Sequence, residues 1–383
     1  MMLLKRVGCL SVLVATLSGC GILNTFGTDN TPVPAALPTA SVSSKPTVLW
    51  QKSVGAGSDD AYLQLNPAYA NGLIYSVDAN AKVTATRASN GDTVFTRKLK
   101  SSGKSGIGTN GQQLALVDGH ANLFMLDSQN GNVLWQVPVH NQVLATPVMT
   151  ADTTYLKTID GVIAAYRNSD GAMLWSYNHG SPTLVLRAGS AVLLDGDTLY
   201  AGFADGVVVA LDNRTGNELW QQVIANPNGF AEIERMVDID STLVLTNGVL
   251  FAATYQGQLA ALNSHSGAIL WQTPLSAYAN IALVNNAVIV PEADGTLTAF
   301  NRVNGHVLWQ QKHLAWRFLT GLTVMKQNLL FGDKEGYVHW VQAATGQYLN
   351  HVQPSKNPLY SSPLVVDDTV YSLDSAGKLA AIK

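Results

Sequence analysis

The sequence contains few charged residues and almost no cysteine. Asp, Glu, Lys and Arg make up 13% of its 383 residues, about half of the usual share, and the net charge is −3. It has no block of basic residues, so nucleic acid is not an expected partner. The only two cysteines, Cys9 and Cys20, lie in the first 20 residues. The rest of the chain therefore cannot form a disulfide, a thiolate zinc site or a cysteine nucleophile.

Motifs of catalytic and cofactor-binding sites are also missing. After residue 20 we find no amphipathic helix, no Gly-x-Ser-x-Gly elbow and no EF-hand loop. The eight histidines are scattered without the spacing of paired metal ligands. Asp127 and Asp212 recur at turns, where capping of the backbone is the expected role. The sequence therefore predicts a protein that is not an enzyme and that uses no cofactor or metal.

One phrase of about ten residues recurs along the chain, and its clearest copy, residues 210–220, reads ALDNRTGNELW. Alternating apolar residues lead into a turn with Asp212 and Gly216, and a second apolar pair ends in Trp220, as in a β-hairpin. The turn glycines of the copies are Gly91, Gly131, Gly171, Gly216, Gly267, Gly305 and Gly346. A repeat of roughly 40 residues with only strand-like content is typical of a β-propeller.

Two further strands precede each phrase, so each repeat supplies four strands. We predict an all-β fold, an eight-bladed β-propeller of four-stranded antiparallel blades, over residues 46–383. Residues 47–50 resemble the last strand of a repeat without its partner, and residues 377–383 resemble the strand before it. We therefore expect the N-terminal strand to complete the last blade, which closes the ring and removes both sheet edges.

The tryptophan that ends the phrase has a predicted structural role. An aromatic residue at a fixed position of a repeat is expected to pack between neighbouring blades rather than to stack on a ligand. These tryptophans should therefore stabilise the ring without indicating its function.

The first 20 residues have the pattern of a targeting segment. Lys5 and Arg6 precede an apolar stretch, and residues 17–20 read LSGC. This ending resembles the bacterial lipoprotein box, which implies cleavage before Cys20 and its acylation, for example with palmitate. An ordinary secretory signal with an incidental cysteine is the alternative. Since Gly21 follows, the resemblance implies an outer-membrane anchor with the protein facing the periplasm.

The composition changes again between the targeting segment and the first repeat. Residues 21–45 are rich in Thr, Ser, Ala and Pro and show no apolar period, so we expect a flexible linker. The predicted organisation is a lipoprotein signal peptide at 1–19, a lipidated cysteine and linker at 20–45, and a propeller at 46–383.

Two connections between repeats are longer than the others and flank the fourth repeat. They run from Trp175 to Ala191 and from Trp220 to Leu243. Both lead from an outer strand to the next inner strand, so both should lie on one face, and loops on a rigid scaffold often carry function. Leucines beside charged residues suit the centre of a protein interface, whereas in the alternative they pack back over the ring. The predicted partner-binding residues are Leu184, Leu186, Arg187, Arg235, Asp238 and Asp240.

The LSGC box, the polar linker and the eight repeats together resemble the BamB family, propeller lipoproteins of the bacterial machinery that assembles outer-membrane β-barrels. The family motif L-x-L-R matches residues 184–187, and the motif R-x-x-D-x-D matches residues 235–240. The phrase GYVHW at residues 336–340 resembles the seventh blade of the family. Phe95 and Leu349 depart from the tryptophan of the repeat.

This resemblance implies a non-enzymatic scaffold that docks on the POTRA domains of the barrel-inserting subunit and assists delivery and insertion of nascent outer-membrane proteins. It also implies that the two long loops bind the POTRA domains. Pyrroloquinoline-quinone (PQQ) enzymes share the repeat, so a membrane-tethered quinoprotein dehydrogenase is the alternative. Such enzymes carry a vicinal cysteine pair, which the chain beyond Cys20 cannot supply. A periplasmic ligand- or glycan-binding propeller is a third interpretation, which no motif favours.

Overall fold

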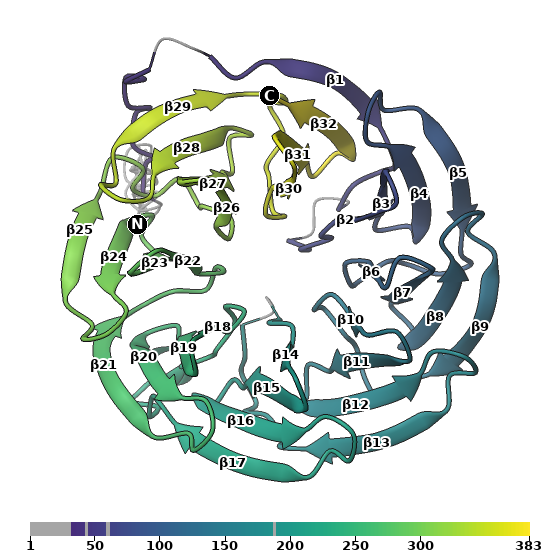
Figure 1. The fold of residues 1–383 in the computed structure, drawn as a ribbon, viewed down its shortest axis with the longest axis horizontal. Coiled ribbons are helices and arrows are strands. Elements are labelled where there is room, and N and C mark those ends of the chain that lie inside the picture. Colours follow the sequence, from purple (N-terminus) through teal and green to yellow (C-terminus); the bar gives the residue numbers. More distant parts are fainter. Residues whose placement is uncertain (1–31, 43–44, 59–61, 187–188) are drawn as a thin grey trace, which may run out of the picture. The chain divides into compact units, whose positions relative to one another are not determined.

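The computed structural model describes residues 32–42, 45–58, 62–186 and 189–383. The chain divides into two units, Met1–Val33 and Pro34–Lys383. In the second unit, eight four-stranded antiparallel sheets follow one another around a ring (Figure 1). The helical content of the described ranges is one short 3-10 helix, η1 (Glu232–Arg235). The prediction of an all-β, eight-bladed propeller is confirmed.

Each blade begins with a short strand near the ring centre and ends with a longer strand at the rim (Figure 1). Blades 1 to 4 consist of β2 (Ala68–Ala70), β3 (Leu73–Val77), β4 (Lys82–Arg87) and β5 (Thr93–Lys98); β6 (Gly108–Thr109), β7 (Gln113–Val117), β8 (Asn122–Asp127) and β9 (Val133–Pro138); β10 (Val148–Met149), β11 (Thr153–Lys157), β12 (Val162–Arg167) and β13 (Met173–Asn178); and β14 (Leu193–Asp195), β15 (Thr198–Gly202), β16 (Val207–Asp212) and β17 (Glu218–Val223). Blades 5 to 8 consist of β18 (Val244–Thr246), β19 (Val249–Ala253), β20 (Gly257–Asn263) and β21 (Ile269–Leu275); β22 (Ala282–Val284), β23 (Ala287–Pro291), β24 (Leu297–Asn301) and β25 (Val307–Gln311); β26 (Thr323–Met325), β27 (Asn328–Gly332), β28 (Val338–Gln342) and β29 (Tyr348–Val352); and β30 (Leu364–Val366), β31 (Thr369–Leu373), β32 (Lys378–Ile382) and β1 (Val48–Ser53).

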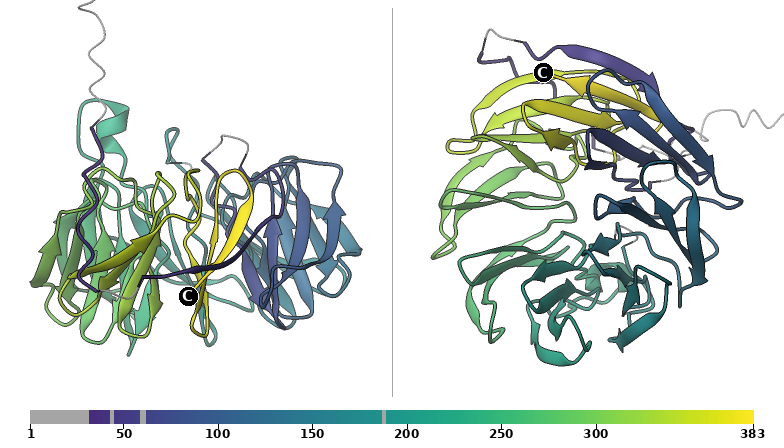
Figure 2. Two further views of the ribbon diagram at one scale, coloured as in Figure 1. Left: turned by 90° about the horizontal axis from the view of Figure 1, so that it is seen from above. Right: turned by 45° about the vertical axis from the view of Figure 1, so that its right-hand side comes forward.

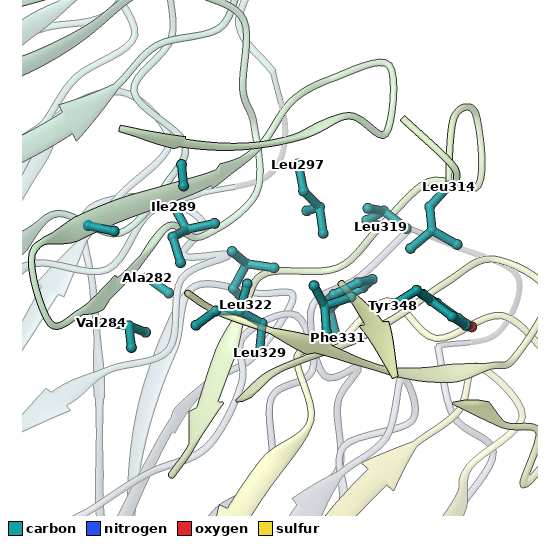
Figure 3. Packing of buried hydrophobic residues seen from close by; sticks show 14 residues of the cluster. Ala282, Val284, Ile289, Leu297, Leu314, Leu319, Leu322, Leu329, Phe331 and Tyr348 are labelled. Atoms are coloured by element: carbon teal, nitrogen blue, oxygen red, sulfur yellow. The ribbon is translucent and has the colours of Figure 1, made fainter. Parts of the chain in front are cut away.

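The hydrophobic core lies between neighbouring blades. Strand β16 reads VVVALD and is buried along almost its whole length, because a blade packs against each of its faces. The rim strand β17 instead alternates between exposed and half-buried residues. Figure 3 shows the junction of blades 6 and 7, where Ile289 and Leu297 belong to the same buried cluster as Phe331. The repeat therefore folds only as part of a ring, because each sheet needs its neighbours to cover it.

The tryptophan of each phrase packs against the turn glycine of the next blade, as predicted. A methyl group added to Gly216 would lie 2.5 Å from Cε3 of Trp175. The indole Nε1 of Trp175 also donates a hydrogen bond to the carbonyl oxygen of Asn213, at 3.0 Å. The same indole-to-carbonyl bond is made by Trp50, Trp135, Trp220, Trp271 and Trp309. The repeat spacing thus joins one blade to the next through a specific contact.

Replacing Gly216 by alanine is expected to destabilise the protein by about 2–4 kcal/mol, because the methyl group adds overpacking to a left-handed backbone. The φ of Gly216 is 72°. Gly196 is a matched control, since its φ is 55° but its missing side chain faces open space. Its replacement by alanine should cost only the backbone strain, about 1–2 kcal/mol. Thermal unfolding compares the two variants, and equal losses would contradict the proposed packing role of Gly216.

The two ends of the propeller meet in blade 8, as predicted. Strand β1 pairs with β32 in antiparallel register, with Trp50 opposite Ala381 and Ser53 opposite Lys378. Beyond the strands, the backbone N–H groups of Thr47 and Lys383 donate to each other's carbonyl oxygens. The N-terminal strand therefore completes the last sheet and closes the ring.

This closure also explains why blade 7 has no tryptophan at the end of its phrase. The strand register pairs Asn350 with Trp340, just as it pairs Trp220 with Ala210 in blade 4. Asn350 therefore occupies the tryptophan position of blade 7, and the sequence-based placement of Leu349 there is wrong by one residue. Elsewhere the tryptophan packs on the glycine of a hairpin turn in the next blade, but in blade 8 that turn is replaced by the two chain ends. Instead, the N–H groups of Ser41 and Val42 donate to the carbonyl oxygen of Leu349, at 3.0 and 3.3 Å. A preceding chain segment thus occupies the rim where no turn glycine exists.

Part of the predicted linker lies along blade 7. Besides the bonds to Leu349, the N–H of Ala35 donates to the carbonyl of Ala315, and the buried guanidinium of Arg317 donates to the carbonyl of Ala35 at 2.8 Å. Residues 34–42 are thus held by backbone and side-chain hydrogen bonds, where composition had suggested a flexible chain. The predicted signal peptide, Cys20 and the linker up to residue 31 lie outside the described residues. Within the described ranges, we find no helix long and apolar enough to cross a membrane.

Candidate partner-binding site

The two long loops lie next to each other on one face of the propeller. Residues 179–192 connect β13 to β14, and residues 224–243 connect β17 to β18, so both lead from the rim of one blade to the centre of the next. The repeated hairpin turns lie on the opposite face, because successive strands within a blade are antiparallel. The second loop contains η1, which projects from its face (Figure 2, left).

Asp238 and Asp240 of the second loop hold the first loop in place. The backbone N–H of Leu186 donates to Oδ1 of Asp238 at 2.8 Å, and the N–H of Gly189 donates to Oδ1 of Asp240 at 3.2 Å. The hydroxyl of Ser190 donates to the carbonyl oxygen of Ile239 at 2.8 Å. Asp238 is only 1% exposed. Both aspartates thus support the first loop, which carries Leu184 and Leu186 and is called the leucine loop below.

The side chains that face solvent come from both loops. Leu184 is 42% exposed, Leu186 is half-buried and Arg235 is exposed. Phe230 and Ile233 are also exposed, and sequence reasoning did not single them out. The carboxylate of Glu234 accepts hydrogen bonds from the N–H of Phe230 at 2.9 Å and thereby fixes this tip. The sequence did contain a signal for Phe230 and Ile233, because both are apolar residues in the longer of the two loops.

A cavity of about 580 Å³ is lined by both loops, by the ring and by residues of the preceding connection between blades 2 and 3. The side chains that line it include Lys157, Leu184, Leu186, Phe203, Asp238 and Asp240. A second cavity of about 140 Å³ is lined by Leu184 and Arg235. The structure therefore brings together five of the six predicted partner-binding residues, and Arg187 lies outside the described residues.

The two aspartates are electrostatically strained. Burial raises the pKa of Asp238 to about 6, although the hydrogen bond from Leu186 lowers it. Burial and the nearby charge of Asp238 raise the pKa of Asp240, whereas Lys157 lowers it. A carboxyl whose pKa rises on folding stabilises the fold below its unfolded pKa, and this contribution is lost as the pH rises through its folded pKa. For Asp238 the loss falls between about pH 4 and pH 6.

Lys157 is a further residue of this site that sequence reasoning missed. It is the last residue of β11 in blade 3 and belongs to neither loop. One signal was available, because every other blade has an uncharged residue at this position: Val77, Val117, Gly202, Ala253, Pro291, Gly332 and Leu373. Among the described residues, those of this site included, no group of three or more His, Cys, Asp or Glu side chains could hold a metal ion.

Comparisons with known proteins agree with this architecture. A family described as outer membrane protein assembly factor BamB matches residues 96–311 and 293–383. The outer membrane protein assembly factor BamB of Yersinia pestis is 30% identical over 97% of this chain and 96% of its own length. The crystal structure of BamB from Moraxella catarrhalis superposes with a TM-score of 0.80 and 26% identity, over 88% of this chain and 99% of that one.

The fold extends to enzymes as well. A quinohemoprotein alcohol dehydrogenase from Comamonas testosteroni has a TM-score of 0.71, over 88% of this chain and 76% of that one. Its identity is only 13%, so the likeness shows a shared fold alone. The family match and the full-length relatives near 30% identity decide the classification: this chain belongs to the BamB family of outer membrane protein assembly factors.

Proposed function

We propose that this protein is a lipid-anchored, non-enzymatic scaffold of the machinery that assembles β-barrels in the outer membrane. In this proposal the two long loops dock on the POTRA domains of the barrel-inserting subunit. The protein assists the delivery and insertion of nascent outer-membrane proteins and faces the periplasm. The names of its relatives, which are assembly factors of outer membrane proteins, support the assignment.

One structural observation carries the docking proposal. Leu184 is exposed on a loop whose backbone is fixed by Asp238 and Asp240 of a second loop. Binding through a surface loop costs free energy when the loop must become ordered on binding. The loop that carries Leu184 is already ordered in the free protein, so this cost is avoided. Apolar side chains on a pre-organised loop, with Arg235 beside them, match the centre and rim of a protein interface.

The direct test is binding between the full-length protein in detergent and the isolated POTRA domains of the barrel-inserting subunit. Calorimetry should give a dissociation constant in roughly the micromolar range or tighter, as expected of an interface of standard size. No heat of binding at about 100 µM of each partner would overturn the docking proposal.

The lipid anchor is tested by replacing Cys20 with alanine. Without the thiol no acyl chain can be attached, so the variant should be absent from the outer-membrane fraction. It should be recovered as a soluble or uncleaved form, because stable anchoring needs two or more acyl chains at about 0.8 kcal/mol per buried methylene. Envelope fractionation and immunoblotting measure the distribution, and a variant that fractionates like the unmodified protein would exclude the lipoprotein assignment.

A further inference from the structure

The ammonium group of Lys157 forms hydrogen bonds to the first loop and to strand β15 of blade 4. Its Nζ donates to the hydroxyl of Ser190 at 2.6 Å and to the carbonyl oxygen of Gly202 at 2.7 Å. Ser190 lies near the end of the first loop, and its hydroxyl donates a hydrogen bond to the carbonyl oxygen of Ile239 in the second loop. One lysine of blade 3 is thus linked to blade 4 and to both loops.

The neighbouring repeat position makes room for this arrangement. In blade 4 the residue equivalent to Lys157 is Gly202, and a methyl group there would lie 2.2 Å from Cγ2 of Ile239. The second loop can therefore approach the ring only because blade 4 has no side chain at this position. Two adjacent blades depart from the apolar repeat in complementary ways, one by adding a cation and one by removing a side chain.

Lys157 also compensates the negative charges of Asp238 and Asp240. Asp238 and Asp240 both line the cavity with Lys157, and their Oδ2 atoms are buried without a hydrogen-bond partner in the part of the chain that is described. Two neighbouring buried carboxylates repel each other and are costly to desolvate unless a cation compensates them. The attraction of both aspartates opposes the burial that lowers the pKa of Lys157.

We propose that Lys157 is a positioning residue of the docking site, whose charge keeps Asp238 and Asp240 able to hold the leucine loop. The effect of Lys157 on binding rests on the proposed docking function. Its effect on the position of the loop concerns the free protein and does not depend on docking. Without the ammonium group, the two carboxylates must be hydrated or protonated. Hydration opens the loop and releases the N–H groups of Leu186 and Gly189.

The experiment compares Lys157→Met with the double variant Lys157→Met/Asp240→Asn, which removes one negative charge together with the positive one. Lys98→Met, an exposed lysine of β5, is the matched control. Hydrogen exchange of the amides in residues 184–190 is measured on the full-length protein in detergent. Affinity for the isolated POTRA domains is measured on the same samples, at pH 8 and at pH 5.5.

At pH 8, Lys157→Met should reduce the exchange protection of Leu186 and Gly189 by roughly tenfold and weaken binding by a similar factor. The double variant should regain most of both, and the single variant should recover at pH 5.5 as the carboxyls take up protons. A purely structural lysine would show neither rescue. The other titratable groups that face this cluster are Asp205, His179 and Tyr62, and all of them are present in every variant compared.

Unchanged protection in Lys157→Met, or a double variant no better protected than the single one, would overturn the inference. If Lys157→Met does not fold, recovery of folding in the double variant supports the inference and its absence refutes it. If the unmodified protein does not bind the POTRA domains but the exchange results are as expected, only the docking function is wrong. If it binds and the loop protection never changes, only the role of Lys157 is wrong.

Discussion

Replacing Leu184 and Leu186 together by alanine is expected to abolish copurification with the barrel-inserting subunit and to leave the protein folded. Truncating an apolar side chain at the centre of an interface costs about 1–3 kcal/mol or more. The pair should therefore lose about 3 kcal/mol or more, roughly a 150-fold loss of affinity. The cost to the fold should stay below about 1 kcal/mol, because Leu184 is exposed and Leu186 is half-buried.

The backbone explains why the two effects separate. The loop is held by the main-chain N–H groups of Leu186 and Gly189, which remain when the leucine side chains are removed. The variant should thus keep the loop in place and lose only its contact surface. Calorimetry with the isolated POTRA domains measures the affinity, and thermal unfolding measures the stability.

Asn304→Ala is the control for this experiment, because Asn304 is exposed in a hairpin turn on the opposite face and its side chain caps only the N–H of His306. It should change neither binding nor melting. The combination of Asp238→Ala with Arg187→Ala should also abolish binding. Because Asp238 is buried and supports Leu186, we expect this second variant to act through the position of the loop. Normal binding by both variants would place the docking surface elsewhere.

Deleting residues 47–54 is expected to destabilise the propeller by several kcal/mol. The deletion removes β1, which leaves the backbone groups of β32 unpaired at a sheet edge. It also removes Trp50, which packs on Gly91 of blade 1 and donates a hydrogen bond to the carbonyl of Ala88. Burial of a tryptophan contributes at most about 4–6 kcal/mol. The ring therefore loses a strand and an inter-blade contact at once.

A milder change separates the two losses. Trp50→Phe keeps β1 and most of the ring contact but removes the indole donor, so it should cost only about 1 kcal/mol. Blade 1 already has phenylalanine at this position, and Phe95 packs on Gly131 of blade 2 in the same way. Thermal unfolding of both variants measures the difference. A deletion variant that melts like the unmodified protein would mean that closure by the N-terminal strand does not stabilise the ring.

The sequence by itself determined the architecture, because local patterns of apolar residues and turn residues specify every blade of the propeller. Alternating apolar residues form the strands. Each turn glycine is needed where the aromatic residue of the neighbouring blade leaves no room for a side chain, as Gly216 shows for Trp175. The offset between residues 47–50 and residues 377–383 predicted the shared last blade, since each end lacked what the other contained. The unusual length of two loops located the candidate site.

Tertiary structure alone decided how the site is built, because it joins Lys157 to two loops that lie farther along the chain. Nothing in the spacing of Asp238 and Asp240 indicated that their carboxylates would accept hydrogen bonds from the backbone of the leucine loop. Lys157 reaches this cluster only because the ring places blade 3 beside blade 4. Composition likewise could not predict that residues 34–42 lie on blade 7. Within this segment the backbone N–H groups of Ala35, Ser41 and Val42 and the carbonyl of Ala35 form hydrogen bonds to the ring, and every sequence possesses such groups.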